Sequence, residues 1–189
     1  MRIDAFAGLR LVGGTSLALQ TGHRKSVDLD LFGTVDFESI DTEKVFTPFR
    51  EVEILQKSKN INVFAIDHVK VDFVNYAYPW LQNTKETGGI RLAGTKDIAA
   101  MKLAAITGRG RKKDFVDMFF LLKTYRLDEI ISFYNQKYRD ASEFLALKSL
   151  LYFDDAEQDV EPEMLTPVFW KDVKTLLTNE VKRYSINRN

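Results

Sequence analysis

The fold is predicted from the stretch Gly13-Gly14-Thr15-Ser16 and from Asp28-Leu29-Asp30, which follows it along the chain. A glycine turn that opens a helix offers backbone N–H groups that can hold a phosphate. Two aspartates at positions i and i+2 of a strand point to the same face of a sheet. The pattern therefore predicts a place for a phosphate chain and, on the next strand, a place for its Mg²⁺.

The segments on either side of this stretch show the periodic patterns of strands and helices. Alternating apolar and polar residues predict strands at 9–12, 27–32, 52–55, 61–66 and 69–76, with helices at 15–21 and 37–49. Asp67-His68 predicts a tight hairpin turn between the last two strands. Helical periodicity dominates after residue 93: it predicts a helix at 95–107 capped by Thr95, one that ends at Tyr125, and others at 129–138, 142–153 and 167–184, with a loop at 154–163. We expect an α/β (α+β) fold, with a small mixed sheet in domain 1–92 and a helical C-terminal domain at 93–189.

The composition excludes several classes of protein and site. The 189 residues carry 27 basic and 27 acidic side chains, so no overall charge steers nucleic acid to the protein. The sequence has no cysteine and only two histidines, which excludes disulfides, thiolate metal sites, cysteine nucleophiles and a three-histidine metal site. We find no signal peptide and no apolar run long enough for a transmembrane helix, and we expect a soluble cytoplasmic protein that binds no membrane.

Three carboxylates are candidates for a metal site. Asp28 and Asp30 alternate with apolar residues, and like charges this close repel each other unless a cation lies between them. The alternative for this pair is an edge strand with a solvated acidic face. Asp72 also lies within an apolar strand, and it becomes a third carboxylate only if that strand neighbours the first; otherwise it faces the surface. Three carboxylates can hold two Mg²⁺ ions, or one ion and a base for an incoming hydroxyl.

Basic residues lie between the glycine turn and the carboxylates. Arg24 and Lys25 are placed to contact phosphate oxygens. For His23 we weigh a hydrogen bond to substrate against a role in supporting the turn, and we favour the structural role.

A second basic group lies near the middle of the chain, where Lys102 precedes a cluster of four basic residues and the acidic pair Asp114 and Asp117. The four basic residues are Arg109, Arg111, Lys112 and Lys113. A solvated charge run is one interpretation. The other places Lys102 at the β- and γ-phosphates, with Asp114 orienting it or a neighbouring arginine. Arg109 or Lys113 would then contact nucleotide or RNA phosphates.

Together these residues resemble the AbiEii/AbiGii-type nucleotidyltransferase toxin family, within the polymerase-β-like nucleotidyltransferase superfamily. The resemblance covers residues 9–122. Its first string is Gly13-Gly14-Thr15-Ser16-Leu17-Ala18-Leu19, then His23-Arg24-x-Ser26-x-Asp28-Leu29-Asp30-Leu31-Phe32. Its second string is Lys102-Leu103-Ala104-Ala105-Ile106, then Arg109-x-x-x-Lys113-Asp114-Phe115-x-Asp117. The family has arginine where this chain has Lys113, and its members have more residues before the glycine turn.

The resemblance implies a role for each matching position. The metal ligands, for Mg²⁺ or Mn²⁺, are Asp28, Asp30 and Asp72. Lys102 and Asp114 join them as catalytic residues that support the triphosphate. The residues that bind the nucleotide are Gly13, Gly14, Thr15, Ser16, Arg24, Ser26 and Arg109.

The implied activity is transfer of a nucleoside monophosphate from an NTP to a hydroxyl. The 3′ end of tRNA is the acceptor for some family members. Such proteins are toxins of two-gene, type IV toxin–antitoxin systems, so NTP, RNA and an antitoxin protein are the expected partners. A nucleotide-binding or partner-binding module with weak or absent turnover is the main alternative, which Lys113 and the short N-terminus favour. A third hypothesis is an unrelated Mg²⁺-dependent phosphohydrolase that uses the same carboxylates.

Overall fold

The structure is a computed structural model that describes residues 4–186, and it divides the chain into two compact units. Unit 1 comprises Met1–Ser16, Ser26–Tyr78 and Asn83–Ala93, and unit 2 comprises Leu17–Lys25, Pro79–Gln82 and Gly94–Asn189. The first three residues, on which the expectation of no signal peptide partly rests, lie outside the described residues. Within 4–186, no helix is both long enough and apolar enough to cross a membrane.

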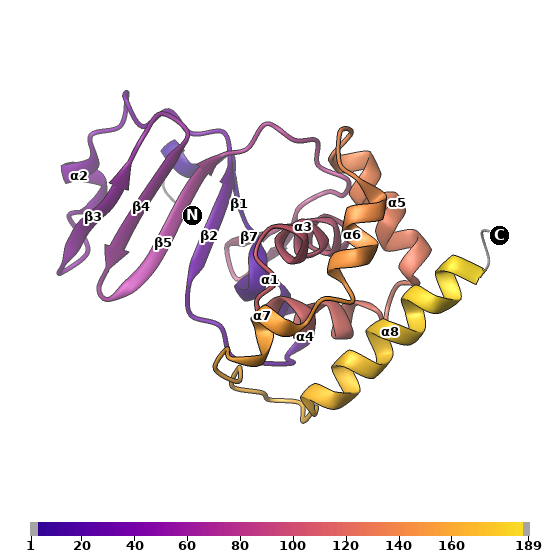
Figure 1. The fold of residues 1–189 in the computed structure, drawn as a ribbon. Coiled ribbons are helices and arrows are strands. Elements are labelled where there is room, and N and C mark those ends of the chain that lie inside the picture. Colours follow the sequence, from indigo (N-terminus) through magenta and orange to yellow (C-terminus); the bar gives the residue numbers. More distant parts are fainter. Residues whose placement is uncertain (1–3, 187–189) are drawn as a thin grey trace. The chain divides into compact units, whose positions relative to one another are not determined.

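Unit 1 is built on a seven-stranded mixed sheet (Figure 1). Its strands are β1 (Leu9–Leu11), β2 (Leu29–Gly33), β3 (Val52–Lys57), β4 (Ile61–Ile66), β5 (Val69–Asn75), β6 (Lys85–Thr87) and β7 (Ile90–Leu92). They lie in the order β3-β4-β5-β2-β1-β7-β6. The β2–β5 and β1–β7 pairs are parallel, and the other neighbours are antiparallel. The predicted mixed sheet is therefore confirmed.

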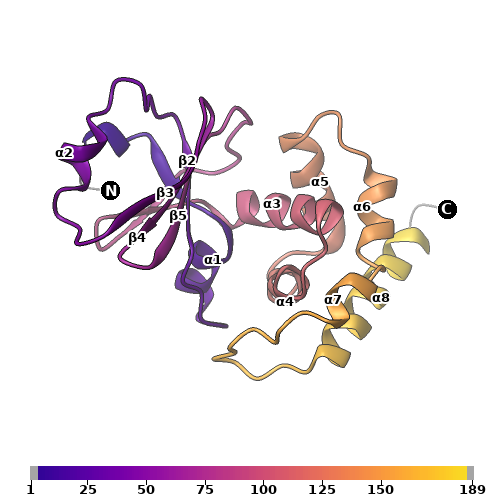
Figure 2. The ribbon, with the colours of Figure 1, turned by 60° about the vertical axis from the view of Figure 1, so that its left-hand side comes forward.

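The helical part of the chain follows the sheet, as predicted (Figure 2). Unit 1 holds the short helices η1 (Asp4–Phe6) and α2 (Thr42–Phe46), and α1 (Gly13–Thr21) begins in unit 1. The helices of unit 2 are α3 (Thr95–Gly108), α4 (Lys112–Leu121), α5 (Leu127–Lys137), α6 (Glu143–Ser149), α7 (Asp154–Glu157) and α8 (Trp170–Ile186). α3 packs against α4, α5 and α6.

Strand alternation gives the sheet of unit 1 one apolar face. On β5, Val71 and Phe73 are buried, whereas Asp72 between them lies on the opposite face. Phe73 belongs to an aromatic cluster in which its ring lies 5.0 Å from that of Phe6 and 5.3 Å from that of Phe37. Burial of this cluster on one face leaves the other face free to present polar side chains.

A buried ion pair fastens the linker 79–82 into unit 2. The Nζ of Lys137 lies 2.7 Å from Asp97 Oδ1 and donates to the carbonyl of Pro79, while both charged side chains are fully buried. Asp97 also accepts hydrogen bonds from the backbone N–H groups of Leu81 and Gln82. Every polar group of the pair thus has a partner, as buried charges require.

Several predicted elements were wrong in their extent. The helix predicted to end at Tyr125 is α4 and ends at Leu121, the helix predicted at 142–153 is α6 and ends at Ser149, and the helix predicted at 167–184 is α8 and begins at Trp170. The helix predicted at 37–49 is limited to α2, because Phe37 packs in the aromatic cluster and the side chain of Asp41 caps a helix that begins only at Thr42. The strand predicted at 27–32 begins at Leu29, and the loop predicted at 154–163 opens with α7.

One hairpin was not predicted, and one helix cap differs from its prediction. β6 and β7 pair through a turn in which Gly88 and Gly89 have φ of 58° and 78°, a conformation typical of tight hairpins. Gly94 is the residue that precedes α3, and the Thr95 hydroxyl lies 2.7 Å from the hydroxyl of Tyr125 instead of capping the helix. The hairpin predicted at Asp67-His68 is confirmed, with φ of 47° and 67°.

The buried pair makes a stability prediction. We expect Lys137→Met to lower the free energy of unfolding by about 3 to 5 kcal/mol, because it leaves Asp97 buried without its counter-charge. The Lys137→Met/Asp97→Leu double variant should lose less than the sum of the single losses. Urea denaturation measures these values, with Lys171→Met, on an exposed position of α8, as the control. Equal losses in Lys137→Met and the control would contradict the prediction.

Candidate active site

Two of the predicted metal ligands lie side by side in unit 1. β2 and β5 pair in parallel with Asp30 directly opposite Asp72, so the strand adjacency on which the third carboxylate depended is confirmed. Residues opposite one another on neighbouring strands share a face. Asp28 is exposed and lies one residue before β2. The sheet thus gathers two carboxylates on its polar face, with a third just beyond the strand end.

The glycine turn lies directly against one of these carboxylates. Gly13 begins α1 with a φ of 67°, and a Cβ at this position would lie 2.2 Å from Asp30 Oδ2. Both the backbone conformation and the close approach therefore require glycine. The same turn continues into α1, whose first N–H groups have no partner within the helix.

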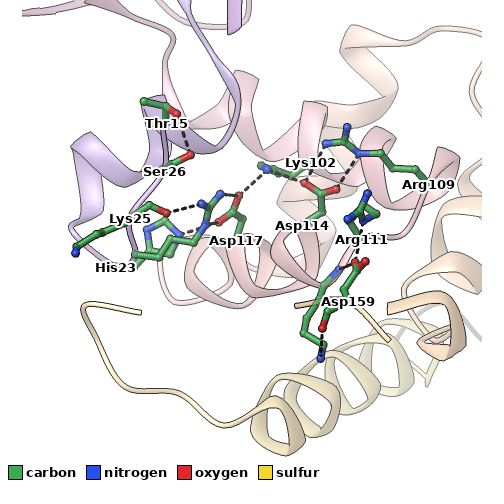
Figure 3. Close-up of polar contacts among 12 residues, drawn as sticks. Thr15, His23, Lys25, Ser26, Lys102, Arg109, Arg111, Asp114, Asp117 and Asp159 are labelled. Carbon is green, nitrogen blue, oxygen red and sulfur yellow. Dashed lines mark hydrogen bonds and ion pairs between the residues drawn. The ribbon is translucent and has the colours of Figure 1, made fainter. Parts of the chain in front are cut away.

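Two hydroxyl groups tie the turn to the segment before β2. The Thr15 hydroxyl donates a hydrogen bond to the carbonyl of Asp28. It also lies 2.8 Å from the Ser26 hydroxyl (Figure 3). Thr15 is 7% exposed and Ser16 is fully buried. The hydroxyl groups of Thr15 and Ser26 thus hold the glycine turn next to Asp28, and whether they also bind a nucleotide stays a prediction.

The donor set of this face suits a hard divalent cation. Carboxylate oxygens are the ligands that Mg²⁺ and Mn²⁺ take in proteins. The two oxygens of Asp72 accept from Lys70 Nζ at 2.7 and 2.6 Å, in a pair that is partly open to solvent. Across residues 4–186 the side chains do not gather three or more acidic, histidine or cysteine groups into a metal-binding cluster. An exposed pair such as Lys70–Asp72 contributes little to stability, so Asp72 can exchange it for a cation at small cost.

Unit 2 contains a buried ion cluster centred on Asp117 of α4. Asp117 Oδ1 lies 2.8 Å from His23 Nε2 and 2.7 Å from Arg24 Nε, and Oδ2 accepts from the second arm of Arg24 at 2.9 Å (Figure 3). Lys102 Nζ lies 2.5 Å from Asp117 Oδ2 and 2.7 Å from Asp114 Oδ1. Both carboxylates are fully buried. The cluster joins α3, α4 and the segment that follows α1.

The charges of the cluster stabilise one another. Burial alone would raise the pKa of Asp117, but the charge of Lys102 and the hydrogen bonds from Arg24 and His23 hold that pKa well below its ordinary value. Burial alone would lower the pKa of Lys102, whereas the charges of Asp117 and Asp114 raise it above its ordinary value. Lys102 and Asp117 therefore stay charged at neutral pH.

The cluster clarifies several predicted roles. The ammonium of Lys102 is 6% exposed and held by two carboxylates, and the guanidinium of Arg24 is likewise taken up by Asp117. The predicted orientation of an arginine by Asp114 is present, because Arg109 Nε donates to Asp114 Oδ2 at 3.1 Å while its side chain is 59% exposed. Direct phosphate contacts by Lys102 and Arg24 stay predictions.

Sequence reasoning gave no role to Asp117, although it lies within the quoted string. The available signal was its spacing: Asp114 and Asp117 are three residues apart on one helix, and such residues share a face. The preference for a structural role of His23 agrees with its full burial between Thr21 and Asp117.

An acidic segment of unit 2 holds the N-terminus of α4 and the segment after α1. Lys112 is 4% exposed and its Nζ donates to the carbonyl of Asp159 at 3.0 Å and to Glu161 Oε1 at 2.9 Å. Lys25 forms an ion pair with Glu163, and its N–H donates to the Glu163 carbonyl at 2.8 Å. Part of the predicted solvated charge run is therefore structural.

The depressed pKa of Asp117 predicts how stability depends on pH. A carboxyl group whose pKa is lower in the folded than in the unfolded state stabilises the fold above its unfolded pKa of about 3.9, and this contribution is lost as the pH falls below that value. We expect Asp117→Asn to lower the free energy of unfolding by about 3 to 5 kcal/mol at neutral pH and to flatten its decline in acid. Urea denaturation between neutral and acidic pH measures both effects, with Asp172→Asn at an exposed position of α8 as the control. If the free energy of unfolding of Asp117→Asn falls in acid as steeply as that of the unmodified protein, the prediction is wrong.

The contact between Gly13 and Asp30 makes a second prediction. We expect Gly13→Ala to lower the free energy of unfolding by about 1 to 3 kcal/mol for its strained φ, plus the effect of the clash with Asp30. Gly22→Ala is the matched control, because Gly22 has a φ of 65° and open space around its Cβ position. Thermal unfolding of both variants, alone and with Asp30→Ala, separates the two terms. Gly13→Ala should lose more stability than Gly22→Ala, and this difference should disappear when Asp30→Ala is added. A difference that remains in the Asp30→Ala background would contradict the contact.

Known proteins share the fold that carries this site. No family model matches the chain. Three solved structures are similar in fold. A candidate nucleotidyltransferase from Helicobacter pylori has a TM-score of 0.63 and 18% identity over 93% of this chain and 85% of that one, and JHP933 from Helicobacter pylori has a TM-score of 0.59 and 16% identity over 96% and 89% of the two chains. MenT4, a nucleotidyltransferase toxin from Mycobacterium tuberculosis H37Rv, has a TM-score of 0.64 and 16% identity over 93% of this chain and 75% of that one. At these identities the similarity shows the fold alone, and at that level the resemblance drawn from the sequence is confirmed.

The sequence also has a relative over nearly its whole length. An uncharacterized protein of Aquifex aeolicus (strain VF5), aq_aa25, is 38% identical over 183 residues, which cover 94% of this chain and 88% of the relative. An identity of this size over this length indicates common descent and a shared fold. The chain therefore belongs to the family of the Aquifex aeolicus protein, and it has the fold found in nucleotidyltransferases such as MenT4.

Proposed function

We propose that this protein is a metal-dependent nucleotidyltransferase that moves a nucleoside monophosphate from an NTP to a hydroxyl acceptor. The observation that carries the proposal is the parallel register of β2 and β5, which sets Asp30 opposite Asp72 on the polar face of the sheet. The glycine turn at Gly13 lies in contact with Asp30. A phosphate-binding turn beside paired carboxylates is what an NTP and its cation require.

Asp28, Asp30 and Asp72 are the residues that would hold Mg²⁺ or Mn²⁺. A bound divalent cation neutralises developing charge on a transferring phosphoryl group. The N–H groups of Gly13 and Gly14 at the start of α1 are proposed to hold the triphosphate, and Asp72 to accept the proton of the acceptor hydroxyl. In such a site the protein contributes mostly positioning and electrostatic stabilisation.

Within unit 2 we propose a supporting role for the ion cluster. Arg109 is the exposed cation there, and Asp114 orients its guanidinium, so Arg109 is proposed to contact a phosphate of the nucleotide or of RNA. Lys102 is proposed to fix Asp114 in this orientation, in addition to its predicted role toward the triphosphate. Lys113, which stands where the resembling family has arginine, is exposed and keeps the positive charge.

The biological setting is proposed by similarity. MenT4, which shares the fold, is a nucleotidyltransferase toxin. We propose that this chain likewise acts as the toxin of a type IV toxin–antitoxin system, with RNA, including the 3′ end of tRNA, as acceptor and an antitoxin protein as partner. Fold similarity does not by itself define the acceptor, so the acceptor must be identified by labelling.

Incubation with each α-³²P-labelled NTP, Mg²⁺ and total RNA tests the proposal. We expect label on a discrete RNA band, lost with EDTA. We expect Asp30→Asn and Asp72→Asn to reduce labelling by about a hundredfold or more, because a metal site supplies several kcal/mol of transition-state stabilisation. Asp140→Asn, at an exposed position of unit 2, is the matched control.

The other outcomes discriminate among the alternatives. NTP binding without labelled product, in a folded protein, would favour the nucleotide-binding module. NTP consumption without labelled acceptor would favour a phosphohydrolase that uses the same carboxylates. Full labelling by Asp30→Asn would refute the assignment of the carboxylates.

A further inference from the structure

Unit 1 contains a cavity that the proposed reaction does not use. Its volume is about 840 Å³, and it is lined by the segment after β2, the β3–β4 turn and the end of β5. Asn62 of β4 forms part of its wall and is 1% exposed. Asn62 pairs with Phe73, the residue after Asp72, so the cavity lies on the face of the sheet opposite the carboxylates.

One polar atom in this wall has no partner. Asn62 Oδ1 accepts no hydrogen bond, and it is the single buried side-chain polar atom in this condition among residues 4–186. Its amide nitrogen donates to the carbonyl of Ser58 at 3.0 Å, which fixes which atom is the oxygen. A buried acceptor without a partner is costly, so a donor from a ligand or from water is expected to satisfy it.

The position of Asn62 in its strand is itself unusual. The inward-facing positions of β4 are 62, 64 and 66, and the other two are the buried Phe64 and Ile66 of the aromatic core. Strand alternation therefore predicts an apolar residue at 62. A polar side chain that breaks the pattern of a packed strand is typical of a functional position.

Hydrogen bonds hold the rim of the cavity in place. The Ser58 hydroxyl donates to the carbonyl of Ile61 at 2.8 Å and accepts from its N–H at 2.9 Å, which closes the β3–β4 turn. Asn75 donates to the carbonyl of Lys59 at 3.1 Å and accepts from the N–H of Val35 at 2.8 Å. The rim is thus ordered before any ligand binds.

The groups around the cavity match the parts of a ribonucleotide. The buried oxygen of Asn62 is an acceptor, and every nucleobase carries an N–H donor. Lys57 and Lys59 at the rim are exposed and form no ion pair with any described residue, so both are available to a phosphate. The exposed carboxylate of Asp36 lies on the same rim and can accept from ribose hydroxyls, as acidic residues do in nucleotide sites.

We propose that this cavity binds one ribonucleotide unit, with its base N–H at Asn62 Oδ1, its ribose hydroxyls at Asp36 and its phosphate at Lys57 and Lys59. Phe37 and Val35, both buried in the wall, supply apolar surface for the base. A free nucleotide and a residue of an RNA strand share this chemistry. The site is separate from the carboxylate face and does not depend on the proposed transfer reaction.

Isothermal titration in EDTA tests the proposal, because EDTA removes the cations that the carboxylate face needs. The probes are the four ribonucleoside 5′-monophosphates, their deoxy counterparts and a short single-stranded RNA. We expect Asn62→Leu to weaken binding about tenfold, the effect of one lost hydrogen bond. Asn179→Leu, at an exposed position of α8, is the matched control.

Two further variants keep the test decisive if Asn62→Leu alters the fold. Lys57→Gln/Lys59→Gln should weaken binding and reduce its dependence on salt, because it removes the phosphate contacts. Asp36→Asn should reduce the preference for ribose over deoxyribose. The site is supported if either the monophosphates or the RNA bind and the variants weaken this binding as expected. Which of the two probes binds identifies the source of the ligand.

The outcomes are independent of the transferase proposal. Asp30→Asn should reduce the labelling of RNA by about a hundredfold or more yet keep the affinity measured in EDTA. An intact affinity without any labelling by the natural protein would still support the cavity. Absence of binding of every probe by the folded protein overturns the proposal. Binding that the variants of Asn62, Lys57 and Lys59 leave unchanged also overturns it.

Discussion

The parallel pairing of β2 with β5 places Asp30 and Asp72, two like charges, opposite each other on neighbouring strands. Such a pair is unfavourable in isolation, so its presence imposes conditions on the rest of the unit. The opposite face must bury enough apolar surface to fix the register, and the aromatic cluster around Phe73 does so. A slip of one residue would move the carboxylates into that cluster. Packing on one face thus maintains the chemistry of the other.

In unit 2 the constraint is the burial of charged side chains, which the ion cluster satisfies. Lys102 and Arg24 carry the charges that face Asp117, and each charge compensates the loss of hydration of its neighbours, while His23 adds a hydrogen bond. The cluster holds α3, α4 and the segment after α1 together, because its partners come from all three. Asp114 extends the cluster to Arg109, which is more than half exposed. Buried structural charge thereby orients a cation that solvent, or a phosphate, can reach.

Local patterns accounted for much of the fold. Strands with regular alternation, such as β4 and β5, were predicted close to their observed bounds, and so were the helices α3 and α5. The errors arose where tertiary contacts outweigh local preference. Phe37 satisfies a helical pattern but is drawn into the aromatic cluster, and the short β6–β7 hairpin is too polar to produce a strand signal. The carboxylates of the candidate site were found because they interrupt apolar strands.

The sequence alone determined the class of the fold, the glycine turn and the identity of the acidic residues, since these depend on local conformation and side-chain period. The tertiary structure alone decided which residues meet. It set Asp30 beside Asp72 and against Gly13, joined His23 to Asp117 across 94 positions of the chain, and left Asn62 Oδ1 without a partner. Contacts between residues far apart in the chain depend on strand order and helix packing, because these arise from the combined burial of many side chains and no single stretch encodes them.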